Sequence, residues 1–343
     1  MKTFRSMIIG LAALLMLAGA TWAADAPFYK GKTIRIIVGY SPGGGFDTFS
    51  RLLGRFLSEH VPGNPSVLVM NMPGGGSISA ANRVYAMQPG NGLTVVVFNA
   101  GSLVEAVNRK PNIKFDPRKY IWLTDPAIGS LPEVLWVRSD LPVKTFEDFK
   151  NLKKPLNAGS TGVGSASTAA TLFLRHLGYP IKAIMGYRGT ANVMAAMERK
   201  ELDARVMSQQ TMQGNYRRYI ESGLVRPILS LGEEPRLKPI PGIATLKDLN
   251  LNAEQQRIAD FMISTMKLLR LFALPPGTPP DRVATLRKAF LDTLKSPELL
   301  KQAELQKLVI SPASPESIKK TVADLYAAPQ ELLDKYKEIV SVK

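Results

Sequence analysis

The sequence predicts an α/β protein whose two lobes hold an anion between them. Apolar runs with the length of strands alternate with amphipathic runs that have the period of a helix along most of the 343 residues. Two glycine-rich loops, about 120 residues apart, each join such a strand to such a helix. A loop of this kind points backbone N–H groups and the positive end of a helix dipole at one place, which attracts anions. We therefore expect one loop in each lobe, facing a shared cleft.

The first loop, residues 39–47, follows the apolar run 33–38 and precedes a helical pattern that starts at Phe49. It lacks the G-x-G-x-x-G spacing of a dinucleotide site. The second loop, residues 159–165, precedes a helical pattern from Ala169 and lacks the Gly-Lys-Ser/Thr ending of a P-loop. Either loop alone could be a tight turn in which glycine relieves strain. Together, with Ser and Thr hydroxyls within the second, they favour binding.

The remaining pattern continues the alternation. Further strands are predicted over residues 65–70, 93–98, 133–138, 202–207 and 225–231. A third glycine-rich loop spans residues 71–77, and Thr145 with Asp148 has the spacing of a helix N-cap. The C-terminal third is helical, with predicted helices over 280–294, 297–308 and two more within 315–340. We expect a discontinuous first lobe, 27–130 and 240–343, and a second lobe, 131–239.

Residues 1–23 have the layout of a cleavable signal peptide. Lys2 and Arg5 precede an uncharged apolar stretch, and small residues lead to a cleavage position after Ala23. That stretch is short for a membrane span of about 20 residues. The chain has no cysteine, which excludes disulfides and thiolate metal sites. We expect an exported, periplasmic protein, in which the net charge of +16 indicates anionic small ligands or a membrane surface, and no nucleic acid.

Catalytic signatures are absent from the sequence. The two histidines, His60 and His176, lie near no nucleophile in the sequence, and there is no G-x-S-x-G elbow. No cluster of His, Asp and Glu has the spacing of metal ligands. We expect a binding protein without cofactor or metal, not an enzyme. The alternative is an exported hydrolase acting on an anionic substrate, which would need His60 or His176 in the cleft as its base. Because only two histidines can titrate near neutrality, affinity is expected to change little between about pH 6 and 8.

These motifs together resemble the periplasmic solute-binding proteins of tripartite tricarboxylate transporters, the TctC or Bug family. The motifs that match, in order, are 32–38, 41–47, 71–77, 89–92, 159–165, 186–189, 201–203 and 274–279. The resemblance implies a two-lobe Venus-flytrap fold, type II-like, of the periplasmic-binding-protein class. It also implies a mono-, di- or tricarboxylate ligand, held largely by backbone N–H groups and water. The implied partners are membrane permease subunits; a ligand-presenting partner of a membrane sensor stays open as an alternative.

The resemblance also implies the site residues, carried over one by one. In the first lobe they are Tyr40, Ser41, Pro42, Gly43, Gly44, Gly45, Phe46, Asp47, Gly76 and Ser77. In the second lobe they are Ser160, Thr161, Gly162, Gly164, Ser165 and Tyr187. Asp47 is expected to hold its own loop and not the anion. Ser167 stands near where many members have a histidine, and residues 267–272 depart from the family pattern, so the ligand's identity stays open.

Overall fold

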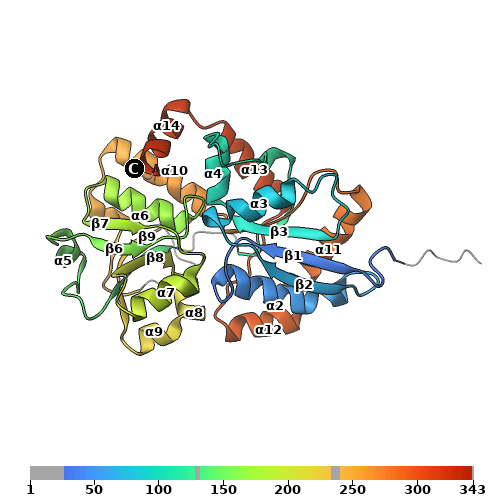
Figure 1. The fold of residues 1–343 in the computed structure, drawn as a ribbon, viewed down its shortest axis with the longest axis horizontal. Coiled ribbons are helices and arrows are strands. Elements are labelled where there is room, and N and C mark those ends of the chain that lie inside the picture. The colour runs from blue at the N-terminus through green and yellow to red at the C-terminus, as the bar shows by residue number, and fades with distance from the viewer. Residues whose placement is uncertain (1–26, 128–131, 233–239, 342–343) are drawn as a thin grey trace, which may run out of the picture.

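Two mixed β-sheets lie side by side in the computed structural model, each with helices on both faces (Figure 1). The structure describes residues 27–127, 132–232 and 240–341. The predicted signal peptide lies outside these ranges. Within them, no helix is long and apolar enough to cross a membrane. The α/β class expected from the alternating pattern is confirmed.

The first sheet has the strand order β2-β1-β3-β11-β4. Its strands are β1 Thr33–Val38, β2 Ser66–Asn71, β3 Thr94–Asn99, β4 Ile121–Thr124 and β11 Arg270–Leu274. β1, β2 and β3 are parallel, whereas β11 is antiparallel to both of its neighbours. Side chains alternate between two cores: Ile36 faces the helices on one side of the sheet, and Ile37 faces those on the other.

Six helices cover this first sheet. Those on the side of Ile36 are α2 Gly45–His60, α11 Pro280–Lys295 and α12 Pro297–Leu305. Those on the side of Ile37 are α3 Ile78–Tyr85, α4 Gly101–Val107 and α13 Pro315–Tyr326. Short 3-10 turns lie at Gly75–Ser77 and Pro117–Lys119. Gly45, Phe46 and Asp47, expected in a loop, form the first turn of α2.

The second sheet has the strand order β10-β9-β5-β8-β6-β7. Its strands are β5 Glu133–Arg138, β6 Leu156–Gly159, β7 Ile181–Ile184, β8 Ala204–Ser208, β9 Val225–Leu231 and β10 Ala244–Thr245. One face carries α6 Ala166–His176, α10 Ala253–Met266 and α14 Gln330–Ile339. The other carries α7 Thr190–Glu198, α8 Gln209–Asn215 and α9 Arg217–Glu221. Helix α5 Phe146–Lys150 begins with the capping box expected for Thr145, and a 3-10 turn spans Leu246–Leu249.

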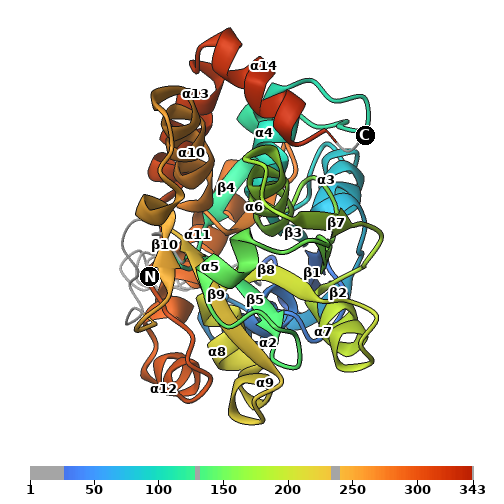
Figure 2. The same ribbon diagram turned by 90° about the vertical axis from the view of Figure 1, so that its left-hand side faces the viewer.

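Three elements from the C-terminal segment, expected in the first lobe, join or cover the second sheet: β10, α10 and α14. β10 pairs with β9, and the apolar stripe of α14 packs on α10, where the Phe261 and Tyr336 rings lie 5.3 Å apart. Figures 1 and 2 show α4, α10, α13 and α14 gathered on one side of the molecule, over both sheets. The period of apolar residues in the sequence shows that a helix has a buried face, but not which sheet that face covers. Buried residues of these four helices and of both sheets form one continuous hydrophobic core on this side.

Candidate ligand-binding site

A cavity of about 40 Å³ lies where the ends of strands from both sheets face each other. The first sheet and its loops contribute Tyr40, Gly44, Gly45, Phe46, Asn99, Leu269 and Arg270. The second contributes Glu133, Thr161, Ser165, Ser167, Thr190, Arg205, Met207, Ser208 and Thr211. Most of these residues carry polar side chains or present backbone N–H groups. The cavity is therefore built for a polar guest.

The N-terminus of α2 forms one wall of this cavity. Gly44 is the N-cap residue, with φ −87°, and Gly45 is the first helical residue. The first N–H groups of a helix have no intrahelical partner, so they point outward with the positive end of the dipole. A Cβ built on Gly45 would lie 2.7 Å from Thr211 Oγ1 and 3.1 Å from Arg270 Nη2. Only glycine lets the other side of the cavity approach this helix so closely.

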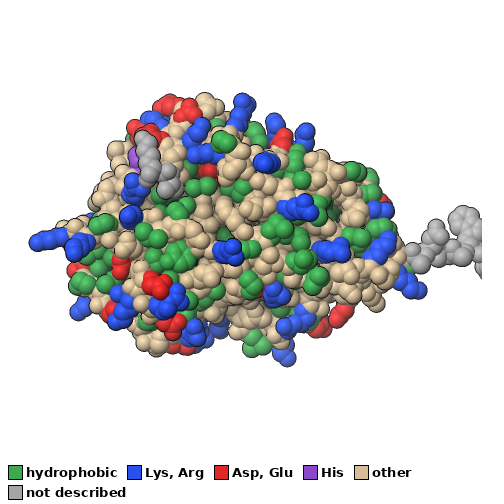
Figure 3. Space-filling view, in the orientation of Figure 1, with side chains coloured by type: hydrophobic (Ala, Val, Ile, Leu, Met, Phe, Trp, Pro, Cys, Tyr) green, Lys and Arg blue, Asp and Glu red, His purple; other side chains and the backbone are tan. Residues whose placement is uncertain are grey.

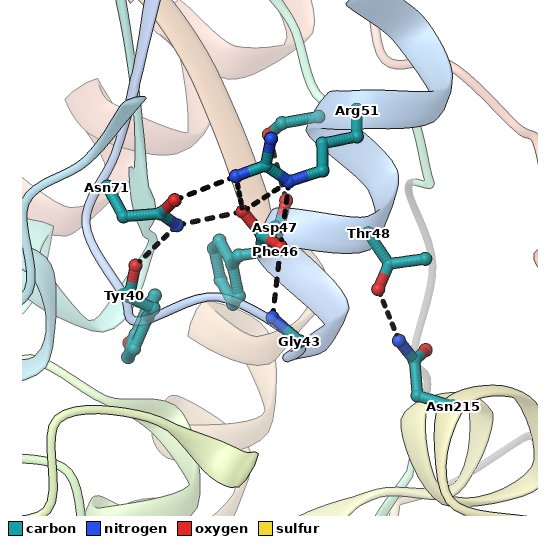
Figure 4. Close-up of polar contacts among 9 residues, drawn as sticks. Tyr40, Gly43, Phe46, Asp47, Thr48, Arg51, Asn71 and Asn215 are labelled. Atoms are coloured by element: carbon teal, nitrogen blue, oxygen red, sulfur yellow. Dashed lines mark hydrogen bonds and ion pairs between the residues drawn. The ribbon is translucent and has the colours of Figure 1, made fainter. Parts of the chain in front are cut away.

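Asp47 holds the first loop in place from inside α2 (Figure 4). Its buried carboxylate accepts hydrogen bonds from Gly43 N–H at 3.0 Å, Asn71 Nδ2 at 2.8 Å and Arg51 Nε at 3.0 Å. Burial acts to raise the pKa of Asp47, but the hydrogen bonds from Arg51, Gly43 and Asn71 together lower it below the usual value. The carboxylate is thus directed to its own loop, as the sequence suggested, and does not line the cavity.

The second loop and the start of α6 form the opposite wall. Ser165 is the N-cap residue of α6, yet its hydroxyl makes no capping hydrogen bond with the described part of the helix. Thr161 Oγ1 is buried and has no hydrogen-bond partner among the described residues. A buried hydroxyl without a partner costs free energy unless a guest supplies one. The Thr161 hydroxyl is therefore available to donate to a bound anion, whereas the Ser165 hydroxyl interacts with the Tyr40 side chain.

Substitution of these two residues separates binding from helix capping. We expect Thr161→Val to weaken carboxylate binding by roughly ten- to hundredfold, because a hydrogen bond to a charged partner contributes about 1.5–3 kcal/mol. The melting temperature of the unliganded protein should not fall, since Thr161 Oγ1 bonds to no described residue. Ser165→Ala should also weaken binding, but it removes the hydrogen bond with Tyr40 as well, so it should lower the melting temperature. Calorimetric titration and thermal melting measure the two effects, and lower melting with unchanged affinity would assign both residues a purely structural role.

The two sides touch directly around the cavity. Gly164 N–H donates to the Gly75 carbonyl at 3.3 Å, and Ser41 N–H donates to the Arg188 carbonyl at 3.1 Å. The Tyr216 hydroxyl donates to the Gly43 carbonyl at 2.9 Å. Each bond joins a loop of the first sheet to an element of the second. The described conformation is thus closed around the cavity.

Ten expected site residues do not line the cavity. They are Ser41, Pro42, Gly43, Asp47, Gly76, Ser77, Ser160, Gly162, Gly164 and Tyr187. Ser77 Oγ accepts a hydrogen bond from Asn99 N–H at 2.9 Å, so its hydroxyl fixes a strand end. A Cβ on Gly76 would lie 2.6 Å from Ser165 N. Glycine here permits the backbones to approach, whereas the sequence interpretation assigned it to the ligand.

Sequence reasoning missed three charged residues of the cavity: Glu133, Arg205 and Arg270. Arg205 lies within the run predicted as the strand 202–207, and Arg270 within the stretch 267–272 that departs from the family pattern. Glu133 is the first residue of β5. A charged residue inside an otherwise apolar strand is seldom buried without a function. That signal was present in the sequence.

The environment of Glu133 changes its titration. Burial raises the pKa of Glu133 to about 7, against the hydrogen bond from Ser167 Oγ at 2.8 Å and the charges of Arg205 and Arg270. Its carboxyl group therefore titrates near neutral pH. This differs from the sequence-based expectation, which considered only the two histidines.

No catalytic histidine or metal cluster is found in the described ranges. His60 lies in the last turn of α2 and His176 at the end of α6, and the cavity lining includes neither. Among the described residues, no group of three or more His, Cys, Asp or Glu is placed to hold a metal ion. The base that a hydrolase interpretation required of His60 or His176 is thus not at this cavity.

The sequence of this chain matches a known family model over most of its length. The model of the tripartite tricarboxylate transporter family receptor, TctC, matches residues 56–337. The chain belongs to this family. A UPF0065 protein of Bordetella pertussis is 28% identical over 296 residues, covering 84% of each chain. A UPF0065 protein of Cupriavidus necator is 29% identical over 305 residues, covering 85% of this chain and 84% of that one.

Solved structures share the fold of this TctC-family chain. The periplasmic binding protein BugD has a TM-score of 0.73 at 19% identity, covering 91% of this chain and 98% of BugD. MatC from Rhodopseudomonas palustris, solved with bound malate, has a TM-score of 0.68 at 21% identity, covering 90% of this chain and 99% of MatC. An R. palustris protein solved with adipate has a TM-score of 0.69 at 20% identity, covering 89% of this chain and 97% of that one. The two-lobe periplasmic-binding-protein fold is confirmed.

Proposed function

We propose that this protein is a periplasmic solute-binding protein that closes its two lobes on an organic carboxylate and delivers it to the permease subunits of a tripartite tricarboxylate-type transporter. One observation carries the proposal: buried hydrogen-bond donors without partners surround a cavity that opposite lobes close. Arg205 Nε, Arg270 Nε, Arg270 Nη2 and Thr161 Oγ1 have no acceptor among the described residues. An anion with several acceptor oxygens satisfies such a set.

The comparisons support a carboxylate as that anion. MatC was solved with malate and another R. palustris protein with adipate, and both share the fold. We propose that the first lobe comprises residues 27–130 with much of 240–343, and the second lobe 131–239 with β10. Tyr40, Gly44, Gly45, Phe46, Thr161 and Ser165 would contact the ligand, and the other expected site residues would support or close the site.

We propose a binding role without catalysis, a cofactor or nucleic acid. The two histidines lie away from the cavity, which removes the bases that a hydrolase interpretation named. Figure 3 shows Lys and Arg side chains scattered over this face, without the continuous basic stripe expected for nucleic-acid binding. Genes for membrane subunits beside this one would favour transport, and a neighbouring sensor-kinase gene would favour the sensing alternative.

A thermal-shift screen against mono-, di- and tricarboxylates tests the proposed function. An acid present at about 100 times its dissociation constant adds about 2.7 kcal/mol to the free energy of unfolding. At least one class of carboxylate should therefore raise the melting temperature of the chain lacking its signal peptide, whereas the matched amides should not. Failure of every acid to do so would contradict carboxylate binding.

The titration of Glu133 gives the binding reaction a pH dependence. Tyr40, Arg205 and Arg270 are the titratable or charged groups that interact with Glu133, whose pKa burial raises to about 7. An anion beside Glu133 favours its protonated form. Affinity should be constant below about pH 6 and should fall by up to about tenfold per pH unit above 7. Calorimetry from pH 6 to 9 measures this change. Glu133→Gln should abolish it, and an unchanged slope in that variant would exclude Glu133 as its cause.

A further inference from the structure

Two buried arginines face the cavity from opposite lobes. Arg270 is the first residue of β11 in the first sheet, and Arg205 lies in β8 of the second. Arg270 is 0% exposed and Arg205 is 3% exposed. A guanidinium removed from water this completely is normally paired with an acid, because an unpaired buried charge is strongly destabilising. The partners of these two side chains therefore decide what the cavity is built to hold.

Neither arginine is fully satisfied by the protein. Arg205 donates to the Gly159 carbonyl at 2.9 Å and to Thr190 Oγ1 at 3.3 Å, and Arg270 Nη1 donates to Gln210 Oε1 at 3.4 Å. The ion pairs formed within the described ranges include neither arginine. The Nε atoms of both, and Nη2 of Arg270, have no acceptor among the described residues. Each wall of the cavity thus keeps at least one charged donor free.

Two buried acids, Glu133 and Asp125, lie near these arginines. Among the described residues that line the cavity, Glu133 is the one acid, and its Oε2 accepts a hydrogen bond from Ser167. The Asp125 carboxylate accepts backbone N–H bonds from Ala127, Leu269 and Arg270. Burial lowers the pKa of Arg270 to about 10, which keeps the guanidinium charged at neutral pH. Both Asp125 and Glu133 interact electrostatically with Arg270, and Glu133 also interacts with Arg205, but neither acid accepts a hydrogen bond from the free guanidinium donors.

Each guanidinium lies beside the start of a helix. A Cβ on Gly45, the first residue of α2, would lie 3.1 Å from Arg270 Nη2. Arg205 bonds to Thr190, the first residue of α7, and to Gly159, which opens the second loop. A helix N-terminus and a guanidinium at one place form a strong site for a carboxylate. The cavity contains two such half-sites, one on each lobe.

We propose that Arg205 and Arg270 select a ligand with two anionic groups, a dicarboxylate, with one carboxylate on each guanidinium. The inference rests on the proposed carboxylate binding and adds the number and spacing of the charges. The cavity of about 40 Å³ has room for about three water molecules. A ligand with two charges also ties the two lobes together, since each lobe supplies one arginine.

Calorimetric titration with matched acids tests the inference. Succinate and butyrate have the same chain length and differ by one carboxylate, as do malonate and propionate. We expect the unaltered protein to prefer each diacid by about 100-fold or more, which is the range measured when one partner of a buried charge pair is removed. Arg270→Met and Arg205→Met should each reduce this preference to about tenfold or less, whereas Arg270→Lys should retain part of it.

Arg138→Met is the matched control. Arg138 is another buried arginine of the second sheet, but its Nε donates to Asp140 at 2.9 Å and it lies outside the cavity lining. Its replacement should leave the diacid preference unchanged. Equal affinity of the unaltered protein for succinate and butyrate would overturn the inference while leaving carboxylate binding intact, and this outcome needs no variant to fold. Retention of the full preference by folded Arg270→Met and Arg205→Met would also overturn it. Absence of binding by any acid would contradict the proposed function itself.

Discussion

Gly164→Ala is expected to weaken carboxylate binding by about 100-fold or more without unfolding the protein. A Cβ at this position would lie 2.9 Å from both the Gly75 carbonyl oxygen and Ser102 Oγ, which belong to the opposite lobe. Closure would then stop short of the described conformation. Hydrogen bonds from the second loop would be lost, each contributing about 1.5–3 kcal/mol to a charged ligand. Calorimetric titration with the best acid from the thermal screen measures the loss.

Gly44→Ala is the matched control for this variant. A Cβ on Gly44 would lie 3.8 Å from Thr190 Cβ, an ordinary van der Waals contact, and the Gly44 backbone has φ −87°, which alanine adopts readily. Gly44→Ala should therefore still close its lobes, which small-angle X-ray scattering measures, whereas its affinity also reports the contact of Gly44 with the ligand. Unchanged binding by Gly164→Ala would show that the contacts between the second and third glycine-rich loops do not govern closure.

Asp47→Ala is expected to lower the free energy of unfolding by about 3 kcal/mol. The substitution removes hydrogen bonds from Arg51, Asn71 and Gly43 and leaves buried donors without an acceptor. Because the folded state holds the pKa of Asp47 below its usual value, this contribution is present above about pH 4 and is lost as the pH falls through the folded pKa. Urea unfolding at pH 7 and pH 3.5 measures both effects, and the two proteins should differ less at the lower pH.

Asp148→Ala provides the comparison for Asp47→Ala. Asp148 also accepts two backbone N–H bonds, from Lys144 and Thr145, but in an exposed capping box. Its loss should cost less than the loss of Asp47, because water can replace a hydrogen bond at an exposed cap. A loss for Asp47→Ala no larger than for Asp148→Ala would mean that the buried network does not hold the first loop.

Local patterns predicted the elements that depend on nearby residues. The strands β1, β5 and β9 occupy the predicted ranges 33–38, 133–138 and 225–231, because continuous apolar runs of this length can be buried only in a sheet. β11 was missed, since its apolar run is short and lies between Arg270 and Pro275. The position of α14 over α6 and α10 was also missed, because it depends on contacts between segments far apart in the sequence.

The candidate site was likewise predicted where it depends on local sequence and missed where it depends on distant contacts. The glycine-rich loops predicted where helix N-termini meet the cavity, because glycine content and hydroxyl residues are local signals. The sequence did not place Arg205 and Arg270 opposite each other, since one lies in β8 and the other in β11, in different sheets. Nor did it show that Gly76 and Gly164 lie against backbone of the opposite lobe, which depends on how the lobes meet.

A crystal structure of the protein with the tightest-binding acid of the screen tests the central claim most directly. We predict electron density for the acid inside the closed cavity, with a carboxylate within hydrogen-bond distance of Gly45 N–H or Arg270 and contacts to Thr161 from the second lobe. An acid bound elsewhere, such as the surface groove lined by Gln213, Arg217 and Lys307, with the cavity filled only by water, would contradict this account.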